Sequence, residues 1–338
     1  MTSGKKPQGD SQTELNLSNM DTRKVQVSGK STYLITLPKN WVVNSGLEAG
    51  TVVFISYLDD GSIAITPRIN KKRPLIKVLE QGNKDIEDFK RDIIGTYIMG
   101  GYQYLEIHAD FKSFDFKNEI KGLIQNLIGV EVIETTEFKI VVQELLETER
   151  FTIEKGLTRM SAIVYQMISE SLSVLKENNY DLIEDVITRD NEVDKMFYLV
   201  SKQFINRLSL NKVSKNSSLN LIETFYYRLV AGNIERIGDH ATKIVSALER
   251  NIPENDVSKL IDTGEASLNL YSESVESFKL SDSKTANEIL RKSKDLSKNI
   301  IEFEQPATTS TCIVLDSFIR IRNYAENIAE LTIDLSQQ

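Results

Sequence analysis

The segment ERIGDHATKI, residues 235–244, decides the fold of the C-terminal half of this chain. Ile237 and Ile244 stand two helical turns apart, which is typical of a helix with one buried face. Glu235 and Asp239 stand four positions apart and therefore project from one side of the same helix. The segment predicts a packed helix that carries a pair of carboxylates.

The helical period continues through the rest of the C-terminal part. The expected helices are 152–178, 180–210, 217–249, 254–279, 282–304 and 308–336. The breaks between them contain asparagine, serine or proline, which suit helix ends. Long helices joined by short loops pack as antiparallel neighbours. Residues 150–338 are therefore predicted to form an all-α bundle of six helices.

These helices divide into two sets of three with similar patterns. Asp181–Lys195 aligns with Lys284–Lys298, and in the third helix of each set Ile237 aligns with Ile321. The matches keep the same helix order, which favours an internal duplication. Chance similarity between amphipathic helices is the alternative.

Two pairs of acids stand out on consecutive helices of the first set. Asp190 and Asp194 have the same four-residue step as Glu235 and Asp239. If the antiparallel helices bring the pairs face to face, the four carboxylates repel one another unless a cation lies among them. Hard oxygen ligands favour magnesium, calcium, manganese or iron. The pattern therefore predicts a metal site at these four residues.

Two further interpretations stay open on spacing alone. Acids at four-residue steps are common on solvated helix faces, where Arg189, Lys195 and Arg236 would pair with them. His240 adjoins Asp239 and offers a nitrogen ligand, but it points about 100° further around the helix.

The stretch Glu235–Ala241, followed by Ile244, resembles the signature of the phosphate-uptake-regulator (PhoU) family. The resemblance covers about residues 150–338. It implies two three-helix repeats whose paired acid motifs bind metal, commonly iron or zinc. Magnesium and manganese also suit the oxygen ligands, so a divalent or ferric ion is expected.

The second repeat departs from the family pattern. Serines Ser293 and Ser297 align with the acids of the second helix, and Ile319 and Asn323 align with those of the third. All four acids are replaced. We therefore expect one metal centre, in the first repeat.

The N-terminal part has a different character. Residues 1–73 contain ten Lys or Arg and six acids, although the whole chain has a net charge of −8. Residues 1–21 are polar and predict a disordered tail. Residues 22–67 predict four short strands, with a helical turn at Lys39–Asn44. These few elements are too small to form a hydrophobic core by themselves. A second copy of the chain is therefore expected to complete the core.

This module resembles the AbrB/SpoVT family of swapped-hairpin β-barrels. The matching stretches are Lys24–Lys30, Ile35–Trp41 and Gly46–Gly50. The resemblance implies a homodimer whose basic loops meet DNA. The candidate DNA contacts are Arg23, Lys24, Lys30, Ser31, Thr32 and Lys39. The alternative is that the module serves only dimerisation.

Between the module and the bundle, the basic stretch 68–73 leads into residues 74–148, which predict a small α+β linker domain. Its expected helices are Asp85–Gly100 and Asp115–Leu127, and its expected strands are Tyr102–Ala109, Val130–Thr135 and Phe138–Leu145, the last two forming a hairpin. His108 ends a strand and has no Cys or His nearby in the sequence, so a structural role is expected for it. The predicted fold class is thus multidomain α+β: a swapped-hairpin barrel, a linker domain and two three-helix repeats. One cysteine, Cys312, excludes an intramolecular disulfide. The sequence has no signal peptide and no apolar run of about 20 residues, so a cytoplasmic protein without membrane insertion is expected.

The expected function is regulation of phosphate uptake and phosphate homeostasis by a DNA-binding transcription regulator with a metal-binding helical sensor. Fusion of the two domains is an arrangement that resembles archaeal regulators. The alternative is a signalling adaptor that contacts phosphate transporter subunits or a sensor kinase. An enzyme is not expected, since no nucleophile–base set or Gly-rich phosphate loop is visible.

Overall fold

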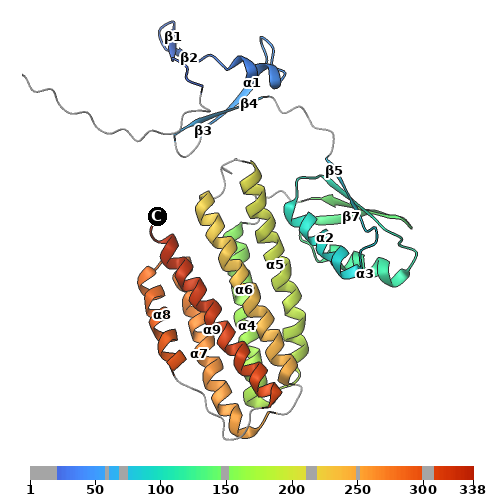
Figure 1. Cartoon of the computed structure of the whole chain (residues 1–338), viewed down its shortest axis with the longest axis vertical. Coiled ribbons are helices and arrows are strands. Elements are labelled where there is room, and N and C mark those ends of the chain that lie inside the picture. Colours follow the sequence, from blue (N-terminus) through green and yellow to red (C-terminus); the bar gives the residue numbers. More distant parts are fainter. Residues whose placement is uncertain are drawn as a thin grey trace, which may run out of the picture. The chain divides into compact units, whose positions relative to one another are not determined.

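The computed structural model describes residues 21–57, 61–67, 75–145, 152–210, 219–248, 252–298 and 308–338, with side chains described to residue 208 in the helix that ends at Leu210. The chain divides into two compact units, Met1–Lys72 and Arg73–Gln338 (Figure 1). The predicted tail up to residue 20 and the basic stretch 68–73 lie outside the described residues.

The N-terminal unit contains two antiparallel hairpins and one short helix. Its elements are β1 (Gln26–Ser28), β2 (Thr32–Leu34), α1 (Lys39–Asn44), β3 (Val53–Tyr57) and β4 (Ile63–Pro67). β1 pairs with β2, and β3 pairs with β4. Gly29, in the first turn, has a φ of +69°, a conformation that only glycine adopts without cost. The four strands and the short helix confirm the prediction for this region.

The described part of this unit has no core of its own. No residue in 21–57 or 61–67 is buried. Several large apolar side chains on the strands are more than half exposed, including Val27, Phe54 and Ile55. The described part of this unit therefore leaves much of its apolar surface exposed to solvent.

The second unit begins with a four-stranded sheet and two helices. Its elements are β5 (Ile76–Glu80), α2 (Ile86–Met99), β6 (Tyr104–His108), α3 (Phe114–Gln125), β7 (Val130–Thr135) and β8 (Lys139–Glu144). The strand order is β5-β6-β8-β7, with β5 parallel to β6 and the other pairs antiparallel. The side chain of Asp85 caps α2 by accepting a 2.8 Å hydrogen bond from the backbone N–H of Asp88. This is the predicted α+β domain.

One strand of this sheet was not predicted. β5 begins shortly after the basic stretch 68–73, and its pairing partner β6 comes after α2 in the sequence. Parallel pairing across a helix leaves no turn signal next to the strand. The hairpin of β7 and β8, which are adjacent in sequence, was predicted correctly.

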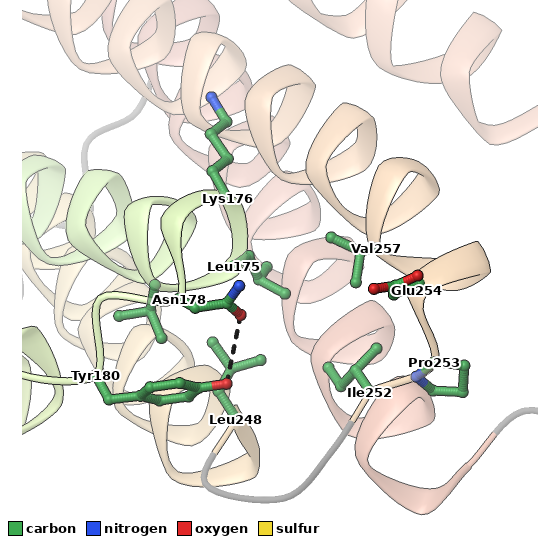
Figure 2. Close-up of a pocket in the computed structure, with 10 residues that line it drawn as sticks. Leu175, Lys176, Asn178, Tyr180, Leu248, Ile252, Pro253, Glu254 and Val257 are labelled. Atoms are coloured by element: carbon green, nitrogen blue, oxygen red, sulfur yellow. Dashed lines mark hydrogen bonds between the residues drawn. The ribbon is translucent and has the colours of Figure 1, made fainter.

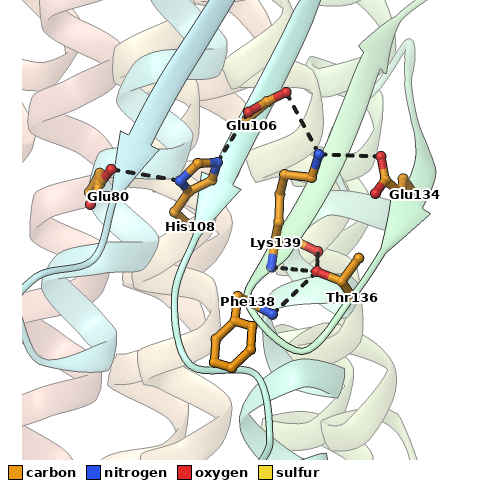
Figure 3. Close-up of polar contacts among 7 residues, drawn as sticks. All are labelled: Glu80, Glu106, His108, Glu134, Thr136, Phe138 and Lys139. Atoms are coloured by element: carbon orange, nitrogen blue, oxygen red, sulfur yellow. Dashed lines mark hydrogen bonds and ion pairs between the residues drawn. The ribbon is translucent and has the colours of Figure 1, made fainter.

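Charged side chains bridge neighbouring strands on this sheet (Figure 3). His108 contacts Glu106 through Nε2 at 3.1 Å and Glu80 through Nδ1 at 3.6 Å. Lys139 lies 3.4 Å from Glu134 and 3.8 Å from Glu106. These contacts support the structural role that the sequence indicates for His108.

The rest of the second unit is helical (Figure 1). The helices are α4 (Ile153–Glu177), α5 (Leu182–Leu210), α6 (Leu221–Leu248), α7 (Glu254–Lys279), α8 (Ser283–Lys298) and α9 (Thr309–Leu335). Each corresponds to a predicted helix, and the predicted breaks at 211–217 and at Pro306 lie outside the described residues. Among the described helices, none combines the length and the apolar character that a membrane crossing requires.

Two sets of three helices form this bundle, as predicted. α4, α5 and α6 pack on one another, α7, α8 and α9 do the same, and the sets meet through α6 with α9 and α4 with α7. Residues aligned by the proposed duplication are buried alike: Val186 and Ile289 are both inaccessible to solvent, as are Ile237 and Ile321. One apolar core runs through both sets.

Gly264 in α7 lets the two sets approach closely. A Cβ atom at this position would lie 2.6 Å from Leu172 of α4 and 2.6 Å from Phe318 of α9. No side chain fits in that space, so the contact of α7 with both neighbours depends on glycine.

Candidate functional site

The four predicted metal ligands lie on facing helices of the first repeat. Asp190 and Asp194 belong to α5, whereas Glu235 and Asp239 belong to α6, and all four are partly buried. The backbone of α6 at Gly238 lies next to Asp190 of α5, because a Cβ built at Gly238 would be in van der Waals contact with Oδ1 of Asp190, at 3.7 Å. The two pairs therefore face each other across the α5–α6 contact.

The carboxylates act on one another electrostatically. Burial, and then the charge of Asp239, raise the pKa of Asp190 above its ordinary value. Burial raises the pKa of Asp239 too, while the nearby cations Lys243 and Arg236 oppose that rise. Because the charge of Asp239 on α6 affects the pKa of Asp190 on α5, the two pairs lie close enough to interact.

The other two acids show larger effects. Burial raises the pKa of Asp194 to about 6, with further contributions from Asp190 and Asp239. Burial raises the pKa of Glu235 to about 7, with contributions from Asp239 and Asp194. Four such acids cannot all be ionised at neutral pH without a compensating positive charge.

Two hydroxyl groups contact the acids. Tyr198 donates a 3.4 Å hydrogen bond to Oδ2 of Asp194, and a hydrogen bond from Thr242 opposes the rise in the pKa of Asp190. Neither residue was predicted. Each was detectable in the sequence, because Tyr198 stands four residues after Asp194 on the helix, and Thr242 follows Asp239 by three.

The bases that the alternative interpretation assigned to these acids do not form ion pairs with them. Within the described residues, no Lys or Arg nitrogen lies within 4.0 Å of any of the four carboxylates. Arg189 instead pairs with Glu170 of α4, and Arg236 lies 5.9 Å from the ring centre of Tyr324. The repulsion among the acids is thus only partly offset by protein cations.

The described residues do not form a preformed coordination sphere for a metal ion. No group of three or more His, Cys, Asp or Glu side chains there has the geometry to hold a metal ion. The donor set fits a hard cation in its chemistry, since it consists of carboxylate oxygens. Binding would therefore require these side chains to rotate toward one another.

His240 faces the second repeat. Its ring lies 5.9 Å from that of Tyr324 in α9, and its buried Nδ1 has no hydrogen-bond partner. Burial lowers the pKa of His240 to about 4, and Lys243 contributes in the same direction. This orientation gives no support to His240 as a further ligand.

The second repeat has a reversed arrangement at the matching place. Ser293, which aligns with Asp190, is fully buried and donates a hydrogen bond to Glu326 of α9. Glu326 aligns with Thr242 when the third helices are superposed by sequence. A hydroxyl–carboxylate contact occurs in both repeats, with the two partners exchanged between helices. The second repeat thus keeps a local polar contact without a group of four acids.

The six candidate DNA contacts are all exposed. Arg23 and Lys24 precede β1, Lys30 and Ser31 lie in the β1–β2 turn, Thr32 begins β2, and Lys39 begins α1. Because a strand rises about 3.3 Å per residue, the turn of this hairpin lies about 20 Å from its open end. Arg23 is also engaged locally, with Asp21 at 3.5 Å. In a single chain these residues do not form one compact basic surface.

A separate pocket of about 600 Å³ lies where the end of α4 approaches the start of α7 (Figure 2). Tyr180 donates a 3.4 Å hydrogen bond to the side chain of Asn178 at its rim. Its charged lining residues are Lys176 and Glu254. None of the predicted site residues lines this pocket.

The architecture defines a class of protein: a small β module comes first in the sequence, and two three-helix repeats, with opposed acid pairs on two antiparallel helices of the first repeat, follow it. Residues 157–248, which include all four acids, match the PhoU domain family. Residues 26–73 match the family described as antidote-toxin recognition MazE, bacterial antitoxin. The chain therefore carries a PhoU domain, with a MazE/AbrB-like antitoxin domain at its N-terminus.

Individual relatives agree with this assignment. The chain is 29% identical over 103 residues to the "phosphate-specific transport system accessory protein PhoU homolog" of Clostridium acetobutylicum, which is 30% of this chain and 44% of the relative. The match thus spans less than half of that relative's length.

The solved structures that this chain matches include PhoU from Pseudomonas aeruginosa, with 19% identity and a TM-score of 0.46 over 56% of this chain and 98% of that one. Another is the phosphate transport system regulatory protein PhoU from Streptococcus pneumoniae, with 19% identity and a TM-score of 0.45 over 54% of this chain and 92% of that one.

Proposed function

We propose that this protein regulates phosphate uptake, with the first helical repeat as a metal-dependent sensor and the N-terminal module as a dimeric DNA-binding element. The observation that carries the proposal is the opposed pair of acid motifs inside the segment that matches the PhoU domain. The matching relative is named as an accessory protein of phosphate transport. The role is regulatory and involves no catalytic turnover.

The sensor would hold one divalent or ferric ion through Asp190, Asp194, Glu235 and Asp239. Iron, zinc, magnesium and manganese all accept carboxylate oxygens. The ion supplies the positive charge that these residues lack. Its binding would draw α5 and α6 together at the site, because both helices contribute two ligands.

The N-terminal module would form a homodimer by interleaving hairpins from two chains. The support is the absence of a buried residue in 21–57 and 61–67, together with exposed apolar side chains on both hairpins. A second copy covers these side chains and closes the barrel that the family resemblance implies. Dimerisation also brings two sets of basic residues together, which compensates for their separation in one chain.

Binding to DNA is tested by charge reversal in this module. Lys24→Glu with Lys30→Glu should abolish retention on genomic DNA fragments at low salt, because phosphate contacts provide sequence-independent affinity. Lys294→Glu, at an exposed position of α8, is the matched control and should bind as wild type does. Wild-type affinity should fall steeply with added salt.

The competing function is that of an adaptor. Unchanged DNA retention in the double variant, with an intact dimer, would contradict DNA binding through these residues. The module would then serve only dimerisation, and the protein would act through contacts with phosphate transporter subunits or a sensor kinase. Co-purification with a transporter subunit would support that role directly.

A further inference from the structure

α5 connects the acid site to the α+β domain. Along this helix, Asp190, Asp194, Tyr198, Lys202 and Asn206 follow at four-residue steps, so each side chain neighbours the next. Because a helix has 3.6 residues per turn, each four-residue step points the side chain about 40° further around the helix axis. The row therefore winds from the facing helix α6 toward the α+β domain.

Tyr198 contacts both regions. Its hydroxyl donates to Oδ2 of Asp194 at 3.4 Å, and its ring packs against the apolar core of the α+β domain. Because this bond uses Oδ2 of Asp194, Oδ1 stays available for a cation.

One turn further, Lys202 fastens α5 to the same domain. Its side chain is inaccessible to solvent, and Nζ donates to the carbonyl oxygen of Tyr97 at 3.1 Å and lies 3.2 Å from Oε2 of Glu144. Nζ also lies 4.2 Å from the ring centre of Tyr97 and 5.4 Å from that of Tyr102. A buried lysine needs such a complete set of partners, because an unpaired one is strongly destabilising.

Gly100, which ends α2, completes this attachment. It has a φ of +54°, and a Cβ atom there would lie 3.2 Å from Oδ1 of Asn206 and 3.9 Å from Nζ of Lys202. The C-terminal half of α5 is thus held closely against the α+β domain, while its N-terminal half carries two of the four acids.

We propose that Tyr198 is a positioning residue that orients Asp194 for the cation. Through Tyr198, binding of the cation at the acid site also affects how the α+β domain packs on α5. Lys202 keeps that domain attached to α5 in both states. The proposal rests on the cation site proposed above. A ligating carboxylate is oriented by the hydrogen bond to its other oxygen, and loss of such a partner typically weakens metal affinity about 10- to 100-fold. The ring of Tyr198 transmits the change in Asp194 to the core that it contacts.

The test compares full-length wild type, Tyr198→Phe and Tyr165→Phe, the last being an exposed tyrosine of α4. Calorimetry gives the Mn²⁺ affinity, and amide hydrogen exchange is measured with and without saturating Mn²⁺. In wild type and in Tyr165→Phe, Mn²⁺ should slow exchange in α6 and also in α2 and β8. In Tyr198→Phe, affinity should fall at least tenfold, and saturating Mn²⁺ should protect α6 alone.

The outcomes separate this coupling from the site on which it depends. Failure of wild type to bind Mn²⁺ would overturn both the cation site and the coupling. Binding by wild type without any change in α2 or β8 would overturn the coupling alone. Wild-type affinity and wild-type protection of α2 and β8 in Tyr198→Phe would do the same, since Tyr198 would then be only a packing residue.

Discussion

Replacing Glu235 with glutamine removes one charge from the acid site and keeps its shape. Without metal, the ionised carboxylate of Glu235 is destabilising, because burial and its neighbours raise its pKa to about 7 from 4.5. Above pH 7 the group is ionised in both the folded and unfolded states, so the full penalty applies. As the pH falls from 7 to 4.5, the folded protein takes up the proton first and the penalty disappears.

The size of the effect follows from this difference in pKa. Each pKa unit corresponds to about 1.4 kcal/mol, which gives an upper value of about 3 kcal/mol. Glu235 keeps some contact with solvent, so about 1–3 kcal/mol is expected. In a chelating buffer, Glu235→Gln should therefore be more stable than wild type by this amount at pH 8, and nearly equal to it at pH 5.

The assay is urea unfolding followed by far-UV circular dichroism, with Glu288→Gln as the control. Glu288 is exposed on α8, so its variant should match wild type at both pH values. Adding Mn²⁺ at about 100 times its dissociation constant should stabilise wild type by about 2.7 kcal/mol at pH 8 and leave Glu235→Gln nearly unchanged. A Glu235→Gln variant that is less stable than wild type in chelator at pH 8 would refute the reasoning.

Three further predictions concern packing and assembly. Gly264→Ala should destabilise the bundle by about 1–3 kcal/mol in urea unfolding, because a Cβ there overlaps Leu172 and Phe318. Gly122→Ala, in α3 with no atom within 4 Å of its added Cβ, should instead be neutral or stabilising by up to about 1 kcal/mol; equal effects at the two glycines would contradict the packing argument. Phe54→Glu, at an exposed apolar site of β3, should convert the dimer to monomer in light scattering, and an unchanged mass would show that this face is not covered by a second copy.

Much of the fold was predictable because the deciding signals are local. The helices α4 to α9 follow from apolar spacing, and β7 with β8 follow from adjacent strand patterns. β5 was missed because its pairing with β6 is set across α2 rather than by a nearby turn.

The site was predictable in part for the same reason. The four-residue steps place Asp190 beside Asp194 and Glu235 beside Asp239 on their helices, and consecutive helices bring the pairs together. Lys202 was not predictable, because its partners Tyr97 and Glu144 belong to another domain. A lysine within the apolar run of α5 was the available signal, and the sequence alone does not say what it contacts.

The central claim is that one cation is held by the four acids of the first repeat. Metal analysis after purification and dialysis against Mn²⁺ or Fe³⁺ tests it most directly, with wild type, Asp194→Ala and Glu235→Ala prepared in parallel. The account predicts about one metal ion per chain in wild type and almost none in either variant, with all three proteins folded by circular dichroism. Equal metal content in all three proteins would contradict it.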